Sequence, residues 1–98
     1  MHVVSKKKIT DFITKYPGSE SSLLSWYSIV NTEIFSDLNE LRNWFPNADL
    51  VGRRTVFNIG GNKYRMITRV NFASKRIFIL YLLTHSEYSK DKWKKDGK

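Results

Sequence analysis

The sequence predicts an α/β protein of the α+β kind, in which an N-terminal helical hairpin packs on a small antiparallel sheet. Three observations predict this class. Apolar residues recur at helical spacing as far as residue 45, branched and aromatic residues then follow in strand-like runs, and a Gly60-Gly61 turn joins two of those runs. The 98 residues are 41% hydrophobic, enough for one compact core and too few for two. We therefore expect residues 1–98 to form one domain.

The first third of the chain predicts a short strand and two helices. Val3 and Val4 are compatible with an edge strand. Ser5 is the expected N-cap of a first helix, which Pro17-Gly18 ends, and Ser19 is the expected N-cap of the second. The loop between the helices is short, so they should form an antiparallel hairpin. The apolar positions that define their two stripes are Ile9, Phe12, Ile13, Tyr16, Leu23, Trp26, Tyr27, Val30 and Ile34.

A third, shorter helix is expected from Asp37 to Phe45. Ser36 is its expected N-cap, and Pro46 stops it because a proline disfavours the helical conformation of the residue before it. From Ala48 onward the periodicity changes from helical to strand-like. The second half of the chain should therefore supply the sheet.

Strands are predicted at 49–51, 55–59, 63–70 and 76–84. The second and third are joined by Gly60-Gly61-Asn62, which supplies the positive φ angles of a tight hairpin. Alternation along 63–70 then separates a largely apolar face from a largely cationic one. The apolar face carries Tyr64, Met66, Thr68 and Val70, and the cationic face carries Lys63, Arg65, Ile67 and Arg69. Residues 76–84 are apolar at nearly every position, which indicates a central strand covered by helices.

Charge is distributed unequally between the two halves. Residues 1–50 contain five Lys/Arg and six Asp/Glu, a net charge of −1, whereas residues 51–98 contain twelve and three, a net charge of +9. Such one-sided basic charge indicates a polyanionic partner, nucleic acid first and an acidic protein or membrane surface second. A solubilising surface is the alternative, above all for the tail from about residue 90.

Composition excludes several other classes of function. The chain has no cysteine, and its two histidines, His2 and His85, are far apart, so we expect neither disulfides nor a metal site. No apolar run approaches the roughly 20 residues that span a bilayer. Three lysines directly follow the first five residues, where a secretion signal would be apolar. The protein is expected to be soluble, cytoplasmic and independent of metals and cofactors.

If the hairpin and the last strand are neighbours in the sheet, their basic residues form a cationic surface that could bind a phosphate backbone. Its centre is the face with Lys63, Arg65 and Arg69, and Arg53, Arg54 and Arg76 border it. Phosphate contacts give affinity and position without reading sequence. This surface alone therefore predicts binding and no chemistry.

His85 is the residue that suggests chemistry, because an unperturbed imidazole titrates near pH 6.5. Metal-free RNA cleavage needs a base for the 2′-OH, cations for the charge on the phosphate, and an acid for the departing 5′-oxygen. Tyr88, Arg65 and Lys63 complete the available set. From spacing alone, a histidine near a tyrosine more often stabilises a strand end than takes part in catalysis, so that interpretation stays open.

The runs 56–65 (VFNIGGNKYR) and 84–88 (THSEY) resemble the HigB toxins, a branch of the RelE/ParE superfamily of type II toxin-antitoxin systems. The resemblance extends to the start at Met1 and His2, the Trp26-Tyr27 pair and the Phe45-Pro46 break. It implies a RelE-like fold, cleavage of mRNA on the translating 70S ribosome without metal ions, and neutralisation by a HigA-type antitoxin. That antitoxin carries a helix-turn-helix domain, so contact with DNA would be indirect.

The resemblance also implies site residues. Arg65 matches the arginine expected at the scissile phosphate, and His85 and Tyr88 match the C-terminal site residues. Asn62, Lys63 and Arg69 are then RNA contacts. Related ribosome-dependent toxins carry lysines where this chain has Val56-Phe57-Asn58, so His85 is one candidate for the general base. In addition, Ser89 follows Tyr88 where an aspartate is common in the branch.

Two functions from other classes remain open at this point. A ParE-like protein would share the fold and poison DNA gyrase without cutting RNA. A passive basic module would bind RNA or the ribosome through the cationic surface alone.

Overall fold

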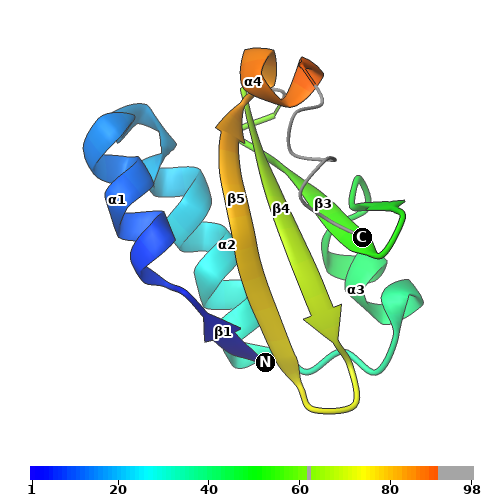
Figure 1. Cartoon of the computed structure of the whole chain (residues 1–98). Helices are drawn as coiled ribbons and strands as arrows, with labels where there is room; N and C mark the ends of the chain where they lie inside the picture. The colour runs from blue at the N-terminus through cyan, green and yellow to red at the C-terminus, as the bar shows by residue number, and fades with distance from the viewer. Residues whose placement is uncertain (62, 91–98) are drawn as a thin grey trace.

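The computed structural model describes residues 1–61 and 63–90, which form a five-stranded sheet and its helices (Figure 1). The strand order is β1-β5-β4-β3-β2. The strands are β1 (His2–Val4), β2 (Asp49–Val51), β3 (Arg54–Ile59), β4 (Tyr64–Asn71) and β5 (Arg76–Thr84). The helices are α1 (Lys7–Lys15), the 3-10 turn η1 (Pro17–Ser19), α2 (Glu20–Thr32), α3 (Leu38–Trp44) and α4 (His85–Ser89). The predicted α+β class is confirmed, and α4 is an element that the sequence analysis did not predict.

The sequence predicted an antiparallel sheet, but the observed sheet is mixed. β2, β3, β4 and β5 pair antiparallel, but β1 runs parallel to β5, with His2 opposite Arg76 and Val4 opposite Phe78. Three helices and three strands separate β1 from β5 in the sequence, and a connection of this length allows the two strands to run in the same direction (Figure 1). β5 is therefore an internal strand between β1 and β4.

Two of the three expected helix caps differ from the structure. Ser5 has a positive φ of 73°, and α1 begins after Lys6 without a side-chain cap. The cap of α3 is Asp37, whose carboxylate accepts a hydrogen bond from the backbone N–H of Glu40 at 2.9 Å. In return, the Glu40 side chain accepts one from the backbone of Ser36, also at 2.9 Å. A carboxylate pair thus takes the place of the serine predicted at this helix start.

Ser19 is at the N-cap of α2 as predicted, but its hydroxyl does not cap the helix. It donates instead to the backbone carbonyl of Tyr16 at 2.6 Å, which fixes the turn between α1 and α2. Ser19 therefore stabilises the loop between the two helices. The predicted N-cap position is confirmed, but the predicted capping hydrogen bond is wrong.

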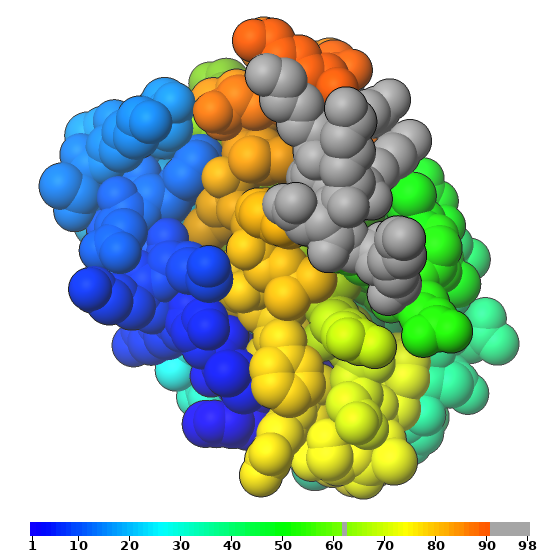
Figure 2. Space-filling model, in the orientation of Figure 1, coloured from blue at the N-terminus to red at the C-terminus, as the bar shows by residue number. Residues whose placement is uncertain are grey.

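The main core lies between the helices and one face of the sheet. Phe57 of β3 is 1% exposed and makes edge-to-face contacts with Trp26 of α2 and Phe45 after α3, at ring-centre distances of 5.4 and 5.1 Å. Figure 2 shows α1, in blue, next to β5, in yellow to orange. The remaining buried apolar residues of this core are Met1, Val3, Ile9, Phe12, Leu23, Val30, Phe35, Leu41, Ala48, Ile59, Met66, Ile77 and Ile79.

An irregularity in β5 changes which of its residues share a face. Ile79 pairs with Thr68 and Tyr81 pairs with Ile67. Leu80 is therefore the extra residue of a β-bulge and has no paired residue on β4. Ile77 and Ile79 consequently belong to the main core, whereas Tyr81 and Leu83 lie on the opposite face. β5 is an internal strand, as expected, and it is apolar on both faces because one face joins the main core and the other packs with Val56 and Ile67.

Candidate active site

The face of the sheet away from the main core carries the residues with functional chemistry, and we call it the open face. On β4 it contains Arg65, Ile67 and Arg69, as the predicted alternation requires. Its centre is apolar, however, because Ile67 pairs with Val56 of β3 and with Tyr81 of β5. The buried pair Val56 and Ile67 packs with Val51, Tyr81, Leu83 and Tyr88. The expected cationic surface is therefore an apolar patch bordered by arginines.

Arg65 is held firmly at the upper end of this face. Its side chain is only 8% exposed, and Nη1 donates a hydrogen bond to the carbonyl of Tyr64 at 3.1 Å. The carbon at the centre of the guanidinium lies 5.5 Å from the centre of the Tyr88 ring. A guanidinium over an aromatic face is attracted by the ring's negative π-surface, and this fixes the plane of the group. The structure thus brings together two of the three predicted catalytic residues.

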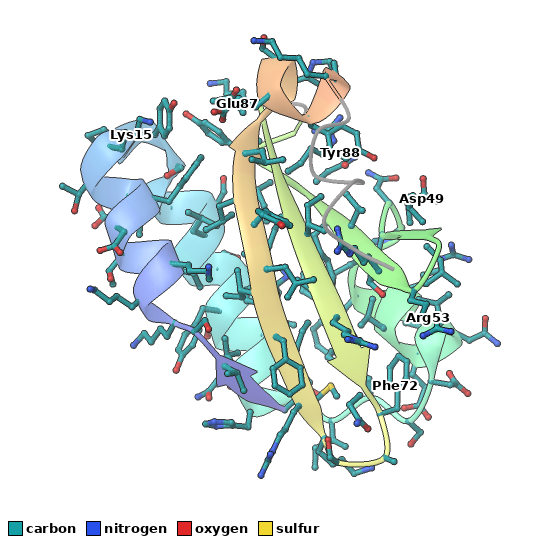
Figure 3. All side chains as sticks on the ribbon, in the orientation of Figure 1. Lys15, Asp49, Arg53, Phe72, Glu87 and Tyr88 are labelled. Carbon is teal, nitrogen blue, oxygen red and sulfur yellow. The ribbon has the colours of Figure 1, made fainter. Side chains whose placement is uncertain are left out.

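Helix α4 positions Tyr88 through a capping box. The Thr84 hydroxyl accepts from the backbone N–H of Glu87 at 3.2 Å, and the Glu87 carboxylate accepts from the backbone N–H of Thr84 at 2.9 Å. Figure 3 shows Glu87 and Tyr88 on opposite sides of the helix. Glu87 is therefore a cap, and Tyr88 is the residue that the helix turns toward the open face.

His85, the third predicted catalytic residue, is exposed at the first position of α4. Its backbone N–H donates to the carbonyl of Lys63 at 3.0 Å, which ties the start of α4 to the turn between β3 and β4. His85, Lys63 and the Arg65–Tyr88 pair consequently lie at the same end of the sheet. An exposed imidazole and a buried guanidinium are thus present at one end of the sheet.

The remaining basic residues are spread over the open face and its edges. Arg54 lies over the Tyr81 ring at 5.8 Å, Arg69 is exposed opposite Phe78, and Arg53 is exposed in the turn between β2 and β3 (Figure 3). Arg76 begins β5, at the end of the strand away from α4. The predicted contact Asn62 lies outside the described residues, as do residues 91–98 of the predicted tail.

Comparison with known proteins decides the family. The model of the HigB toxins, described as the RelE-like toxic component of a toxin-antitoxin system, matches residues 19–91. This chain belongs to the HigB toxin family. The mRNA interferase HigB of Escherichia coli O6:H1 is 37% identical over 93 residues, which are 92% of this chain and 90% of that protein. The mRNA interferase toxin HigB of Escherichia coli K12 is 31% identical over 91 residues, covering 90% and 88%. The resemblance identified from the sequence is therefore confirmed.

Two residues of the open face in this HigB toxin were not singled out from the sequence. Asn58 pairs directly with Arg65, and Tyr81 lies beneath Arg54. The predicted turn at residues 60–62 would have placed residue 58 opposite residue 64, whereas the loop between β3 and β4 is one residue longer and places Asn58 opposite Arg65. Tyr81 could not be found from the alternation of β5, because the bulge at Leu80 reverses the alternation before it.

Within 1–61 and 63–90, this HigB toxin contains no group of three or more His, Cys, Asp or Glu residues that could hold a metal ion. In the same ranges no helix is long and apolar enough to cross a membrane.

Proposed function

We propose that this HigB toxin is an endoribonuclease that cleaves mRNA on the ribosome as the toxin of a type II toxin-antitoxin system. The names of its relatives, mRNA interferases, support the reaction. The observation that carries the proposal is the stacked Arg65–Tyr88 pair on the basic half of the chain, with exposed His85 at the same end of the sheet.

In the proposed reaction the 2′-OH of one nucleotide attacks the adjacent phosphate and displaces the 5′-oxygen of the next. The products are a 2′,3′-cyclic phosphate and a free 5′-OH. Arg65 stabilises the negative charge that grows on the phosphate, as a preorganised cation does best when its own movement is restricted. His85 is the candidate base for the 2′-OH proton, and Tyr88 is the candidate acid for the leaving oxygen.

Binding is assigned to the other predicted contacts. Arg53, Arg54, Asn62, Lys63, Arg69 and Arg76 would hold the phosphate backbone on either side of the cleaved bond. Because Arg76 lies at the far end of β5, the footprint would extend along the whole strand. Such a surface accounts for affinity without sequence selection.

The proposed partners follow from the same surface. The mRNA and the 70S ribosome would meet the open face, and a HigA-type antitoxin would cover Arg65 and Tyr88 to neutralise the toxin. Contact with DNA would be made by the helix-turn-helix domain of the antitoxin. All of these partners would be met in the cytoplasm.

The decisive experiment adds the purified protein to a translation reaction and maps transcript ends with and without ribosomes. We expect new 5′-OH ends within coding regions, and only when ribosomes are present. Cuts in both reactions would contradict ribosome dependence, and intact transcripts in both would contradict the nuclease itself. Breaks in DNA with intact transcripts would indicate a gyrase poison instead.

A further inference from the structure

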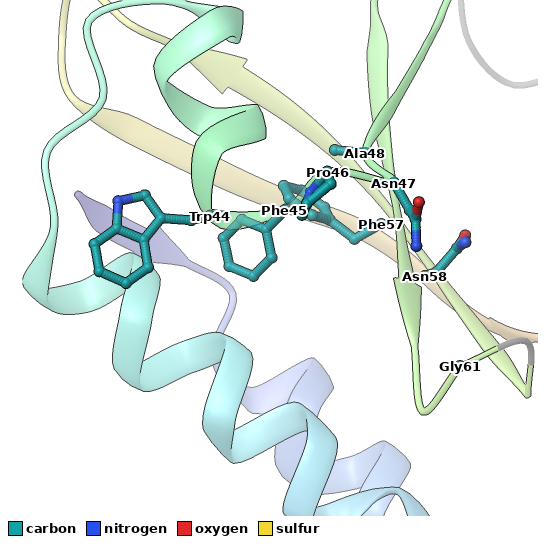
Figure 4. A pocket seen from close by; sticks show the side chains of 8 residues that line it. All are labelled: Trp44, Phe45, Pro46, Asn47, Ala48, Phe57, Asn58 and Gly61. Carbon is teal, nitrogen blue, oxygen red and sulfur yellow. The ribbon is translucent and has the colours of Figure 1, made fainter.

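A pocket of about 380 Å³ lies beside the hairpin, outside the Arg65–Tyr88 site (Figure 4). Ligand sites for small groups occupy roughly 300–1,000 Å³, so it is large enough for one nucleobase. Its wall is formed by the segment after α3 and by the β3 side of the hairpin. The lining residues are Trp44, Phe45, Pro46, Asn47, Ala48, Phe57, Asn58 and Gly61.

The pocket exists because β2 is shorter than β3. β2 pairs only with the first half of β3, Arg54–Val56, and leaves the edge beyond Val56 beside the 44–48 segment. Half-buried Phe45 gives the pocket an apolar base, and the buried ring of Phe57 supports it at a ring-centre distance of 5.1 Å. The hollow is thus built into the strand pairing and rests on core aromatics.

Two exposed amides form the polar end of the pocket. Figure 4 shows the side chains of Asn47 and Asn58 extending in the same direction from their two segments. A carboxamide presents one acceptor and two donors in a plane, the pattern that pairs with the edge of a nucleobase. An apolar base and two amides therefore suit a flat heteroaromatic group.

Asn58 connects this pocket to the candidate active site. It pairs with Arg65 across the β3–β4 ladder, and directly opposed residues have Cβ atoms about 4.5–5.5 Å apart. Arg65 is consequently the direct cross-strand neighbour of a residue that lines the pocket. Single-stranded RNA is read through bases that leave the stack in this way.

We propose that this pocket takes one unstacked base of the RNA next to the scissile phosphate, and that Asn58 and Asn47 read its edge. This inference rests on the proposed nuclease function and assigns to that same site a determinant of sequence choice. Arg65 fixes the phosphate, the apolar base of the pocket accepts the ring, and the amides discriminate among bases. A protein segment of the antitoxin is the competing occupant. Two arginines next to lining residues favour the polyanion: Arg65 pairs with Asn58, and Arg42 donates from Nε to the Ala48 carbonyl at 3.1 Å.

The test is the base composition around mapped cleavage sites. Wild type, Asn58→Ala, Asn47→Ala and the isosteric Asn58→Asp are compared in the translation reaction, with Asn31→Ala on the exposed face of α2 as the matched control. A good bidentate contact discriminates by about 5-fold to 150-fold. We therefore expect both alanine variants to lose at least about fivefold of the base preference at one fixed position, and Asn58→Asp to change which base is preferred there.

Each outcome bears on a different statement. Unaltered base preference in active Asn58→Ala and Asn58→Asp proteins overturns the pocket assignment and leaves the nuclease function standing. The same holds if the variants keep their preference and lose affinity for the antitoxin, since the pocket then belongs to that partner. Wild-type protein that cuts no transcript contradicts the proposed function and the pocket together.

Discussion

At the scale of single residues, the candidate site combines one buried guanidinium with one exposed imidazole. Arg65 is buried against Tyr88 and bonded to its own backbone, whereas His85 stands exposed on the first residue of α4. Electrostatic stabilisation benefits from groups that need no reorganisation, and proton transfer needs a group that can approach the substrate. The two residues are therefore placed according to the tasks we assign to them.

Replacing His85 by Ala should slow single-turnover cleavage by at least about a hundredfold, because general acid-base groups contribute roughly 10²–10⁴ to rates. The fold should be retained, since the hydrogen bond to Lys63 comes from the backbone of residue 85. Circular dichroism checks this point. His2→Ala, at an exposed histidine of β1, is the control and should cleave normally. An unchanged rate in the His85 variant would remove this residue from the mechanism.

Tyr88→Phe separates the phenol from the ring. The variant keeps an aromatic face over Arg65, so a hundredfold loss of cleavage is expected only if the hydroxyl donates a proton. Tyr27→Phe is a matched control, because Lys6 lies over that ring at 4.5 Å. If Tyr88→Phe cleaves like wild type while Tyr88→Ala does not, Tyr88 positions Arg65 and the leaving-group acid is another residue.

At the scale of elements, α4 is the weakest part of the site and depends on its cap. The helix has five residues, too few to be stable on its own. Its sequence did contain a signal, since Thr84 and Glu87 have the spacing of a capping box, yet such a short run without apolar periodicity predicts no helix. The three longer helices and the hairpin were predictable because their periodic patterns extend over several turns or strand residues.

Thr84→Val should impair cleavage more than stability. The change removes the hydroxyl that accepts from Glu87, a loss of about 0.5–2 kcal/mol at an N-cap, and frees Tyr88 from Arg65. Thr84→Ser should restore both properties. The control Thr32→Val removes a hydroxyl from the exposed face of α2 and should leave cleavage unchanged. If the loss of cleavage by Thr84→Val is no larger than its loss of folded protein, as calculated from the urea midpoint, α4 has no specific role in cleavage.

Strand irregularity explains most of what the sequence could not reveal. Leu80 interrupts the alternation of β5, so a count of every second residue assigns Tyr81 and Leu83 to the wrong face. Nothing in a continuous apolar run indicates where an extra residue is inserted. The arginines of β4 were placed correctly, because that strand alternates without interruption.

At the scale of the whole molecule, Phe57 joins the helical layer to the sheet. It contacts Trp26 of α2 and Phe45 beyond α3, and it is almost completely buried. Three separate segments therefore share one aromatic side chain. Its loss should be felt in the stability of the entire fold and not at one element.

Phe57→Ala should lower the free energy of unfolding by about 3–5 kcal/mol, the usual range for a large aromatic in a core. Phe57→Leu should cost less, since it fills more of the volume. Phe78→Ala, at a half-buried position of the open face, is the control and should cost less than Phe57→Ala. Urea titration measures all three. A small effect of Phe57→Ala would show that the layers are joined elsewhere.

The pairing of β1 with β5 has a consequence for the order in which the protein can become active. His2 pairs with Arg76, so β1, the first strand to be synthesised, cannot join the sheet until β5, the last strand, is available. Contacts between such distant parts of a chain form late in folding. Tyr88 follows β5 and cannot reach Arg65 until it too has left the exit tunnel. The cleavage on ribosomes that we propose would therefore begin only after the C-terminal part of the toxin has emerged from the ribosome that makes it.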